Sequence, residues 1–358
     1  MQLIFFLVII SILPHTAVAQ GETSRFDSLF AQQFKKDEPG GAVLISKNGR
    51  IIYKKGFGLE DTRSKKVITT TSLFNIGSIT KTFVAYGILK LAKENKLSLD
   101  DNLGKYFKTF KNPAIAKQVK IYHLLTHTSG LPDNRAVEKD SIFYLTANDA
   151  ENWAPIMQND TLEFIPGEKW KYSNPAFDAL ALIIEKVTGQ KWQEYISNLI
   201  FKPAGMRLST ITDGHHPDTG VAHGYITNAT GQFIEKDYGE EPTFCAAGNG
   251  GIWSSVDELW KYEKAIQGNI FLDSEWIKRS RTIYPMPGWK DTTAFFMGLS
   301  WFIFDEKGGK FIGHTGSQGG FISDYVWLPG KNIFYVLLCN TPKPIHEIRK
   351  AVMDMLKD

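Results

Sequence analysis

β-Rich runs lie at both ends of this 358-residue chain, and the stretch between them is mostly helical. Near the start, two such runs flank Asn48-Gly49, the pair that a two-residue type I′ hairpin turn prefers. Near the end, four more follow one another: M-G-L-S-W-F-I-F, K-F-I-G-H-T, G-F-I-S-D-Y-V-W-L and N-I-F-Y-V-L-L-C. Strands and helices that are segregated along a chain are typical of an α+β fold rather than of alternating βαβ units.

The most economical assembly is one antiparallel sheet that joins the N-terminal hairpin to the C-terminal strands. Helices near the two termini would flank this sheet, and a mainly helical lobe would be inserted beside it. We therefore expect a single domain over residues 20–358. Its sheet lobe would cover about 22–77 and 245–358, and its helical lobe about 78–244. A cleft between two lobes is the default position for a binding site.

The first nineteen residues have the pattern of a secretory signal peptide. An apolar core runs from Leu3 to Leu13, and the small-residue pattern Ala17-Val18-Ala19 predicts cleavage after Ala19. A membrane anchor is the alternative, but the apolar stretch is short for a span and no later stretch is long and apolar enough. We expect a periplasmic or secreted protein with no membrane span after removal of the signal.

The distribution of charge and the spacing of the cysteines and histidines argue against nucleic-acid and metal-ion partners. The formal net charge is +3 and the basic residues are scattered, whereas nucleic-acid binding calls for a clustered basic face. Cys245 and Cys339 have no metal-ligand spacing, and two buried thiols are a simpler interpretation than one disulfide. His123 and His127 have helical i,i+4 spacing, but no acidic residue adjoins them, so we expect structural roles. The oligomeric state is left open.

The stretch F-N-I-G-S-I-T-K-T-F contains the only S-x-x-K of the chain, formed by Ser78 and Lys81. Serine is a preferred helix N-cap, worth about 1 kcal/mol, and on that interpretation Lys81 is a solvated side chain. Positions i and i+3 are also neighbours on a helix, so Lys81 can approach the Ser78 hydroxyl. It can serve as the base for that hydroxyl if burial or a nearby cation lowers the lysine pKa.

Two further polar segments each admit a structural explanation. W-K-Y-S-N-P contains the only Y-x-N, with Tyr172 and Asn174, and Ser-Asn-Pro also commonly starts turns and helices. F-I-G-H-T-G-S-Q-G-G-F is a strand-like run with His314, Thr315 and Ser317, and it also fits an edge strand with a glycine bulge.

Together and in this order, the three segments resemble the serine β-lactamase and penicillin-binding protein superfamily, and most of all its class C β-lactamase-related serine hydrolases. That family carries S-x-x-K at a helix start, Y-x-N in the helical lobe, and K-T-G or H-x-G on a strand. H-L-L-T-H-T-S-G-L-P-D, P-G-E-K-W-K-Y-S-N, F-K-P-A-G-M and G-G-I-W-S-S-V-D-E-L also look like family segments. The resemblance implies a β-lactamase/transpeptidase-like catalytic domain without a metal or other cofactor.

The resemblance also implies roles for individual residues. Ser78 would be the acylated nucleophile, Lys81 would share or relay its proton, and Tyr172 would act as a partner base and then protonate the leaving group. Asn174 would bind the acyl-side amide of the substrate. The backbone N–H groups of Ser78 and Ser317 would form the oxyanion hole. Free tyrosine and lysine have pKa values of about 10, so at least one must be perturbed, and we expect their mutual proximity to be the cause.

His314 departs from the β-lactamase pattern, which usually has lysine at this position. A histidine is mostly neutral at pH 7, so it would hold a substrate carboxylate less firmly but could still donate a hydrogen bond. With Thr315 it would line the substrate-facing strand. We expect a D,D-carboxypeptidase- or esterase-like hydrolase of a small-molecule or short-peptide substrate. The alternatives are a class C type β-lactamase and a non-turnover penicillin-recognising or peptide-binding module.

Overall fold

The computed structural model describes most of the chain. The described residues are 15–135, 141–211, 217, 220–236, 247–290, 294–306 and 309–356. Most of the expected signal peptide and Cys245 therefore lie outside them. Within these ranges, every helix is too short or too polar to cross a membrane.

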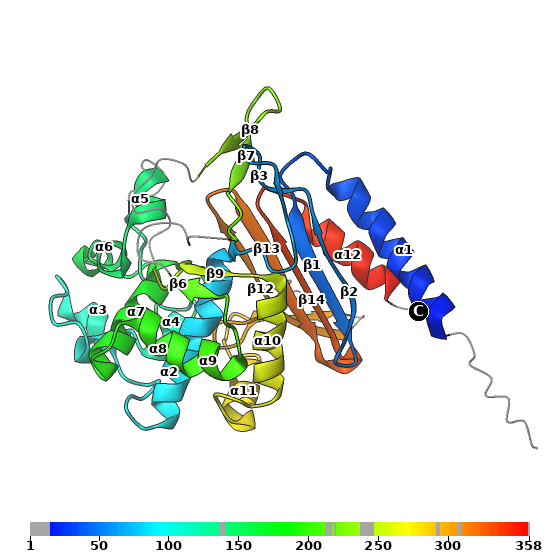
Figure 1. Cartoon of the computed structure of the whole chain (residues 1–358). Helices are drawn as coiled ribbons and strands as arrows, with labels where there is room; N and C mark the ends of the chain where they lie inside the picture. The colour runs from blue at the N-terminus through cyan, green and yellow to red at the C-terminus, as the bar shows by residue number, and fades with distance from the viewer. Residues whose placement is uncertain are drawn as a thin grey trace, which may run out of the picture.

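A seven-stranded antiparallel sheet forms the centre of the molecule (Figure 1). In spatial order its strands are β10 (Phe296–Met297), β11 (Phe302–Glu306), β12 (Gly309–Gln318), β13 (Phe321–Leu328), β14 (Ile333–Cys339), β1 (Gly41–Lys47) and β2 (Arg50–Phe57). β1 pairs with both β2 and β14, so the N-terminal hairpin joins the C-terminal strands as predicted.

The hairpin turn and the central strand follow directly from their residues. Asn48 and Gly49 have φ values of 52° and 74°, the positive angles that a type I′ turn needs. All residues of β14 are buried because the sheet is covered on both faces, which explains its continuous apolar run. Cys339, at the end of β14, is a free buried thiol.

The sequence predicts one continuous strand over residues 297–304, and this prediction is wrong. β10 ends at Met297 and β11 begins at Phe302, with Ser300 between them at a φ of 73°. The chain turns back here, so that β10 and β11 pair as an antiparallel hairpin, and at this turn the Ser300 nitrogen donates to the Leu125 carbonyl of the helical part over 2.8 Å.

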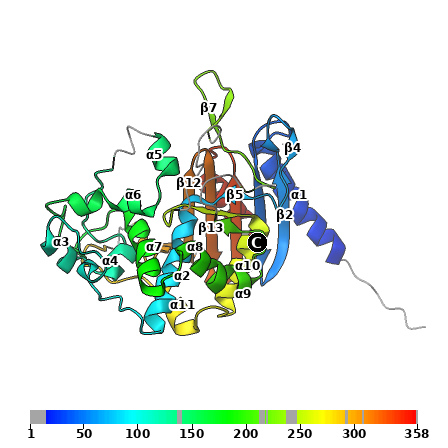
Figure 2. The ribbon, with the colours of Figure 1, turned by 60° about the vertical axis from the view of Figure 1, so that its left-hand side comes forward.

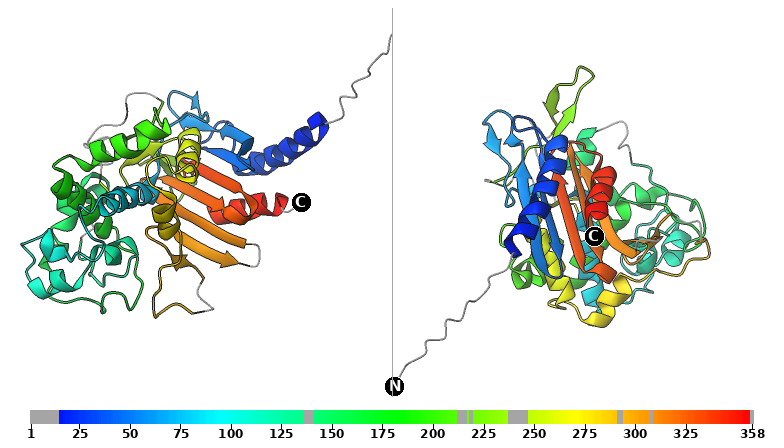
Figure 3. Two further views of the ribbon diagram at one scale, coloured as in Figure 1. Left: turned by 90° about the horizontal axis from the view of Figure 1, so that it is seen from below. Right: turned by 90° about the vertical axis from the view of Figure 1, so that its right-hand side faces the viewer.

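Two terminal helices cover one face of the sheet. They are α1 (His15–Gln33) and α12 (Ile345–Met355), and they lie on the same side in both views of Figure 3. Phe26 and Phe30 of α1 and Ile348 and Val352 of α12 are buried in the apolar cluster on this face. The spacing of these residues gives each helix one apolar side toward the sheet.

The other face carries α10 (Val256–Gln267) and the helical part of the chain (Figure 2). Two helices matter most for the site, α2 (Thr80–Lys93) and α7 (Pro175–Thr188), which contact each other. α7 is followed by Gly189, whose φ of 71° gives the left-handed C-cap conformation that glycine favours. α2 is buried on all sides from Thr80 to Leu89, rather than along the single stripe that its apolar residues indicate.

The remaining elements are short. The helices are α3 (Pro113–Gln118), α4 (Ile121–Leu125), α5 (Ser141–Thr146), α6 (Asp149–Trp153), α8 (Trp192–Ile196), α9 (Lys202–Ala204) and α11 (Ser274–Ser280). The single turns are η1 (Gly77–Ile79), η2 (Leu103–Lys105), η3 (Ile156–Gln158), η4 (Ser197–Phe201) and η5 (Pro329–Lys331). Small sheets pair β3 (Leu59–Asp61) with β4 (Lys66–Val67), β9 (Ile252–Ser254) with both β5 (Phe74–Asn75) and β6 (Thr210–Ile211), and β7 (Tyr225–Thr227) with β8 (Phe233–Glu235).

Candidate active site

Ser78 lies in η1, the single 3₁₀ turn that connects β5 to α2. The N-cap residue of α2 is Ile79, and no side chain caps either η1 or α2. The helix-cap interpretation of Ser78 is therefore wrong, because the chain enters α2 through this turn rather than directly at the serine. Its hydroxyl is instead in contact with Lys81.

Lys81 is completely buried, with 0% of its surface exposed. Its Nζ atom donates to Ser78 Oγ over 2.9 Å and to the Asn249 carbonyl over 2.5 Å. The pKa of Lys81 is lowered to about 7, mainly by burial; the negative charge of Asp178 opposes this shift and the positive charge of Arg135 adds to it. The expectation that Tyr172 causes this shift is therefore wrong, because desolvation is the main cause.

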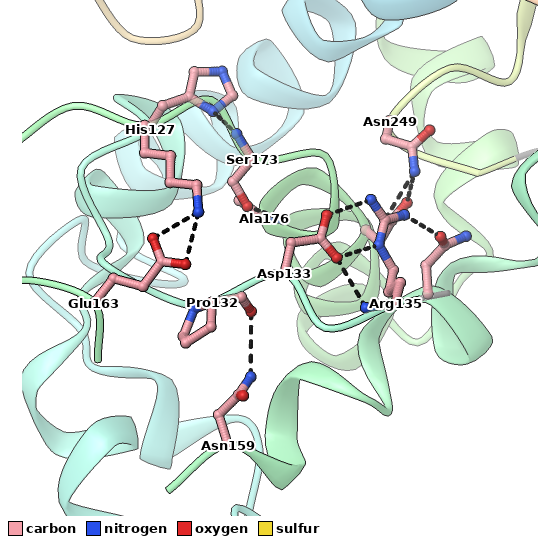
Figure 4. A network of polar contacts seen from close by, with 12 residues as sticks. His127, Pro132, Asp133, Arg135, Asn159, Glu163, Ser173, Ala176 and Asn249 are labelled. Carbon is pink, nitrogen blue, oxygen red and sulfur yellow. Dashed lines mark hydrogen bonds and ion pairs between the residues drawn. The ribbon is translucent and has the colours of Figure 1, made fainter. Parts of the chain in front are cut away.

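Tyr172 lies just before α7 and faces Lys81. The Lys81 Nζ atom is 5.2 Å from the centroid of the Tyr172 ring. The ring of His127 stacks on Tyr172 with 4.4 Å between centroids, and the Ser173 N–H donates to His127 Nδ1 over 3.1 Å (Figure 4). Burial lowers the pKa of His127 well below its usual value, so this ring is neutral. His127, which the spacing alone suggested to be structural, thus fixes the orientation of Tyr172.

β12 forms the opposite wall and carries His314, Thr315 and Ser317. His314 Nδ1 lies 2.6 Å from the Thr315 carbonyl oxygen. Because a carbonyl only accepts, Nδ1 carries the proton of this ring. Burial, with a smaller contribution from the positive charge of Lys81, lowers the pKa of His314 to about 3. The ring is therefore neutral and presents a lone pair at Nε2, which corrects the expectation that it donates to a substrate.

The segment from His314 to Gln318 is open along one edge. β11 pairs with β12 only as far as Gly313, whereas β13 pairs with β12 up to Gln318. The open edge is next to η1: a Cβ atom at Gly77 would lie 2.7 Å from the Ser317 nitrogen, and one at Gly316 would lie 2.0 Å from the Ile76 oxygen. The Ser317 nitrogen is thus beside the turn that carries Ser78.

A cleft of about 510 Å³ opens above these residues. All the site residues predicted from the sequence line it except Lys81, which is buried beneath Ser78. Asn174 lies at the start of α7, where its side chain caps nothing. The outer wall comes from the start of α12 and the residues before it, and includes Lys343, His346 and Glu347.

A buried polar cluster behind Lys81 was not predicted from the sequence. Asn249 Nδ2 donates to both carboxylate oxygens of Asp178, each over 2.8 Å. Asp149 accepts from the Gly248 N–H over 2.7 Å and from the Trp192 indole N–H over 2.8 Å. The only sequence signal was Asp178 itself, a charged residue inside the apolar run P-A-F-D-A-L-A-L, since buried charges need partners.

The two carboxyl groups of this cluster, those of Asp149 and Asp178, differ in charge. Burial and the neighbouring charge of Asp178 raise the pKa of Asp149 well above its usual value, so Asp149 is the protonated member of the pair. Burial also raises the pKa of Asp178, to about 6, although hydrogen bonds from Asn249 and Asp149 oppose that rise. Arg135 lies nearby and is held by Asp133, with 2.7 Å between Nη2 and Oδ2 (Figure 4).

The residues that the structure describes contain no group of three or more His, Cys, Asp or Glu side chains arranged to hold a metal ion. His123 lies apart from the cleft, and its Nδ1 accepts from the Lys120 N–H over 3.0 Å at the start of α4.

Comparison with known proteins gives a consistent result. Penicillin-binding protein 4* of Bacillus subtilis (strain 168) is 27% identical over 317 residues, which are 84% of this chain and 68% of that protein. Protein flp of Staphylococcus aureus (strain MRSA252) is 26% identical over 349 residues, 92% of this chain and 66% of that protein. The chain thus spans about two thirds of the length of these relatives.

Two solved structures share the fold. The octameric penicillin-binding protein homologue from Pyrococcus abyssi superposes with a TM-score of 0.79 at 28% identity, over 96% of this chain and 77% of that one. D-Amino acid amidase from Ochrobactrum anthropi SV3, complexed with L-phenylalanine amide, gives a TM-score of 0.78 at 20% identity, over 96% and 99%. The model of the Beta-lactamase family matches residues 26–356. The chain therefore belongs to the Beta-lactamase family, within the serine β-lactamase and penicillin-binding protein superfamily.

Proposed function

We propose that this protein is an exported serine hydrolase that forms an acyl-enzyme at Ser78 and hydrolyses an ester or the amide of a D-residue. The observation that carries the proposal is the 2.9 Å contact between Lys81 Nζ and Ser78 Oγ. Because burial lowers the lysine pKa to about 7, a substantial fraction of Lys81 is neutral near pH 7 and able to accept the serine proton.

The geometry supports a two-step reaction. Lys81 takes the proton of Ser78 as Oγ attacks the substrate carbonyl carbon, and the C=O electron pair moves onto oxygen. The N–H groups of Ser78 and Ser317 stabilise this oxyanion. The bond to the leaving group then breaks, and the leaving group takes a proton from the Lys81–Tyr172 pair. In the second step water attacks the acyl-enzyme, releases the acid and restores the Ser78 hydroxyl.

His314 bears on the choice of substrate. Its pKa of about 3 leaves it uncharged at neutral pH, and no arginine is among the described residues that line the cleft. Lys343, the lysine in that lining, uses one of its three donors on the Gln33 carbonyl over 2.7 Å and keeps its charge. A terminal carboxylate therefore meets no cation at position 314 itself, which favours esters and amides over a D,D-carboxypeptidase substrate. The D-amino acid amidase of the same fold makes D-amino acid amides the first candidates.

Reaction with two mechanism-based reagents tests the proposal. The protein without its first nineteen residues, and the same protein with Ser78→Ala, are incubated with a fluorophosphonate and with a labelled penicillin, and intact masses are measured. We expect one fluorophosphonate adduct on the wild type and none on Ser78→Ala. An unmodified wild type with both reagents would refute the acyl-enzyme. Penicillin adducts without turnover of any ester or amide would instead indicate a binding module.

Export is proposed from the apolar core and the Ala17-Val18-Ala19 pattern. N-terminal sequencing of the protein recovered from outside the cytoplasm is expected to begin at Gln20. Recovery of the intact N-terminus from the cytoplasm alone would contradict it.

A further inference from the structure

Residues 248–249, whose backbone accepts a hydrogen bond from Lys81, pack closely against α7. A Cβ atom at Gly248 would lie 2.6 Å from the Ala181 Cβ atom and 2.8 Å from the Phe177 oxygen, so only glycine allows this approach to α7. The Gly248 N–H donates to Asp149, and the next side chain, Asn249, donates to both oxygens of Asp178. These contacts fix the Asn249 carbonyl, which accepts from Lys81 over 2.5 Å.

We propose that Asp178 is a positioning residue for Lys81: its carboxylate orients Asn249, whose carbonyl holds the lysine amine against Ser78, and its negative charge favours the protonated amine. This role rests on the proposed function, since it matters for reaction only if Lys81 is the base for Ser78. Asp178 itself lies behind Lys81 and outside the lining of the cleft, so it acts through Asn249 and through its charge.

The groups that face Lys81 come from every element packed around it. Among the described residues, the titratable or charged ones are Asp178 on α7, Arg135 before α5, His127 after α4, Tyr172 before α7 and His314 on β12. Burial lowers the pKa of both histidines, which keeps them neutral. Arg135 is cationic and is paired with Asp133. Asp178 is therefore the anionic member of this described set, and the charge of Lys81 depends on it.

The neighbouring carboxyl group provides a matched control. Asp149 is buried beside Asp178 and hydrogen-bonds with it, but it is the protonated and hence neutral member of the pair. Asp178→Asn removes a negative charge and keeps the shape, with an amide oxygen still able to accept from Asn249. Asp149→Asn also keeps the shape and leaves the charge unchanged. The two variants thus differ in charge at almost the same place.

The experiment measures the rate of fluorophosphonate labelling of Ser78 against pH, from about pH 5 to 9, in the wild type and both variants. The rate is expected to fall on the acid side as Lys81 becomes protonated. Asp178→Asn should move the midpoint of that fall down by about one pH unit, because an opposite charge near a group shifts its pKa by roughly one to three units. Asp149→Asn should leave the midpoint in place. Asp178→Glu should keep the midpoint but lower the rate, because the longer side chain displaces Asn249.

A direct titration separates this inference from the proposed function. The ¹³Cε chemical shift of Lys81, assigned by its loss in Lys81→Met, follows the lysine charge without any reaction. If the wild type does not react with the fluorophosphonate, the proposed function fails, and the Lys81 titration still tests the role of Asp178. Equal Lys81 midpoints in wild type and folded Asp178→Asn, or equal displacements in Asp178→Asn and Asp149→Asn, would overturn the inference. Thermal melts establish that each variant is folded.

Discussion

Gly77 and Ser317 are in direct backbone contact, although they lie in η1 and in β12 at opposite ends of the chain. A Cβ atom at Gly77 would lie 2.7 Å from the Ser317 nitrogen, closer than side chains approach backbone. Gly77 also has a φ of 52°, an angle that residues with a side chain rarely adopt. The contact keeps the Ser317 N–H next to Ser78, where an oxyanion would form.

Gly77→Ala is therefore expected to reduce the rate of Ser78 acylation by about 100-fold, the usual cost of losing one oxyanion donor. The reason is that the new methyl group forces η1 and β12 apart. Gly189→Ala is the matched control, because Gly189 has a φ of 71° but no atom within 4 Å of an added Cβ. It should destabilise the fold by about 1 kcal/mol and leave the acylation rate unchanged. A folded Gly77→Ala variant that reacts at the wild-type rate would argue against this oxyanion site.

Lys81→Met should abolish acylation and stabilise the fold at pH 7. The pKa of Lys81 is about 7 in the folded protein, against 10.5 for the free side chain. Between these values the unfolded chain binds more protons, so the stability contributed by Lys81 rises as the pH increases from 7 towards 10.5 and is lowest below pH 7. Removing the amine should raise the free energy of unfolding at pH 7 by about 2 kcal/mol, less than the full cost of burial because two hydrogen bonds are also lost.

Urea denaturation at pH 7 and pH 9 checks this prediction. The difference in free energy of unfolding between Lys81→Met and the wild type should be smaller at pH 9 than at pH 7. Lys93→Met, on the last turn of the same helix, replaces a partly exposed lysine and should show no pH-dependent gap. A Lys81→Met variant that is less stable than the wild type at pH 7 would show that burial of the amine does not oppose folding.

Local sequence patterns were enough to predict the central antiparallel sheet. Asn48-Gly49 specifies its turn through positive φ angles, and the apolar run of β14 specifies a strand buried on both faces, so the pairing of β1 with β14 followed. The turn between Met297 and Phe302 was missed because it lies inside an apolar run typical of one strand, and the contact of Ser300 with the Leu125 carbonyl, far away in the sequence, has no local signal.

The candidate site divides in the same way. Ser78, Lys81 and Tyr172 were found because side chains of particular types recur at fixed spacings. The carbonyl of Asn249 has no such signature, since every residue carries a carbonyl, and it meets Lys81 across 168 positions of sequence. The cause of the lysine pKa was misjudged for a related reason: desolvation depends on how α2 is enclosed on all sides, which its apolar stripe does not reveal.

Tyr172→Phe should lower turnover by about 100-fold or more, within the range for removal of a general acid or base. The ring would remain stacked on His127, so the fold should change little. Stopped-flow assays with a nitrophenyl ester and intact masses taken during turnover check this prediction and show whether acylation or deacylation is slowed. Tyr122→Phe is the control, because Tyr122 stacks on Tyr284 outside the residues that line the cleft. Equal turnover by Tyr172→Phe and the wild type would show that Tyr172 takes no part in the proton transfer.

His314→Lys should move the specificity towards substrates with a carboxylate. The wild-type ring is neutral because burial lowers its pKa to about 3, and its Nε2 atom has no hydrogen-bond partner among the described residues. A lysine would supply a cation there, and we expect kcat/KM for an acyl-D-alanyl-D-alanine to rise about tenfold relative to the same peptide with a C-terminal amide, the effect of one charge-assisted hydrogen bond. His314→Gln keeps an uncharged acceptor and should preserve the wild-type ratio. Equal ratios in His314→Lys and the wild type would show that position 314 does not face the carboxylate end of the substrate, and the role given to His314 in disfavouring carboxylates would then be wrong.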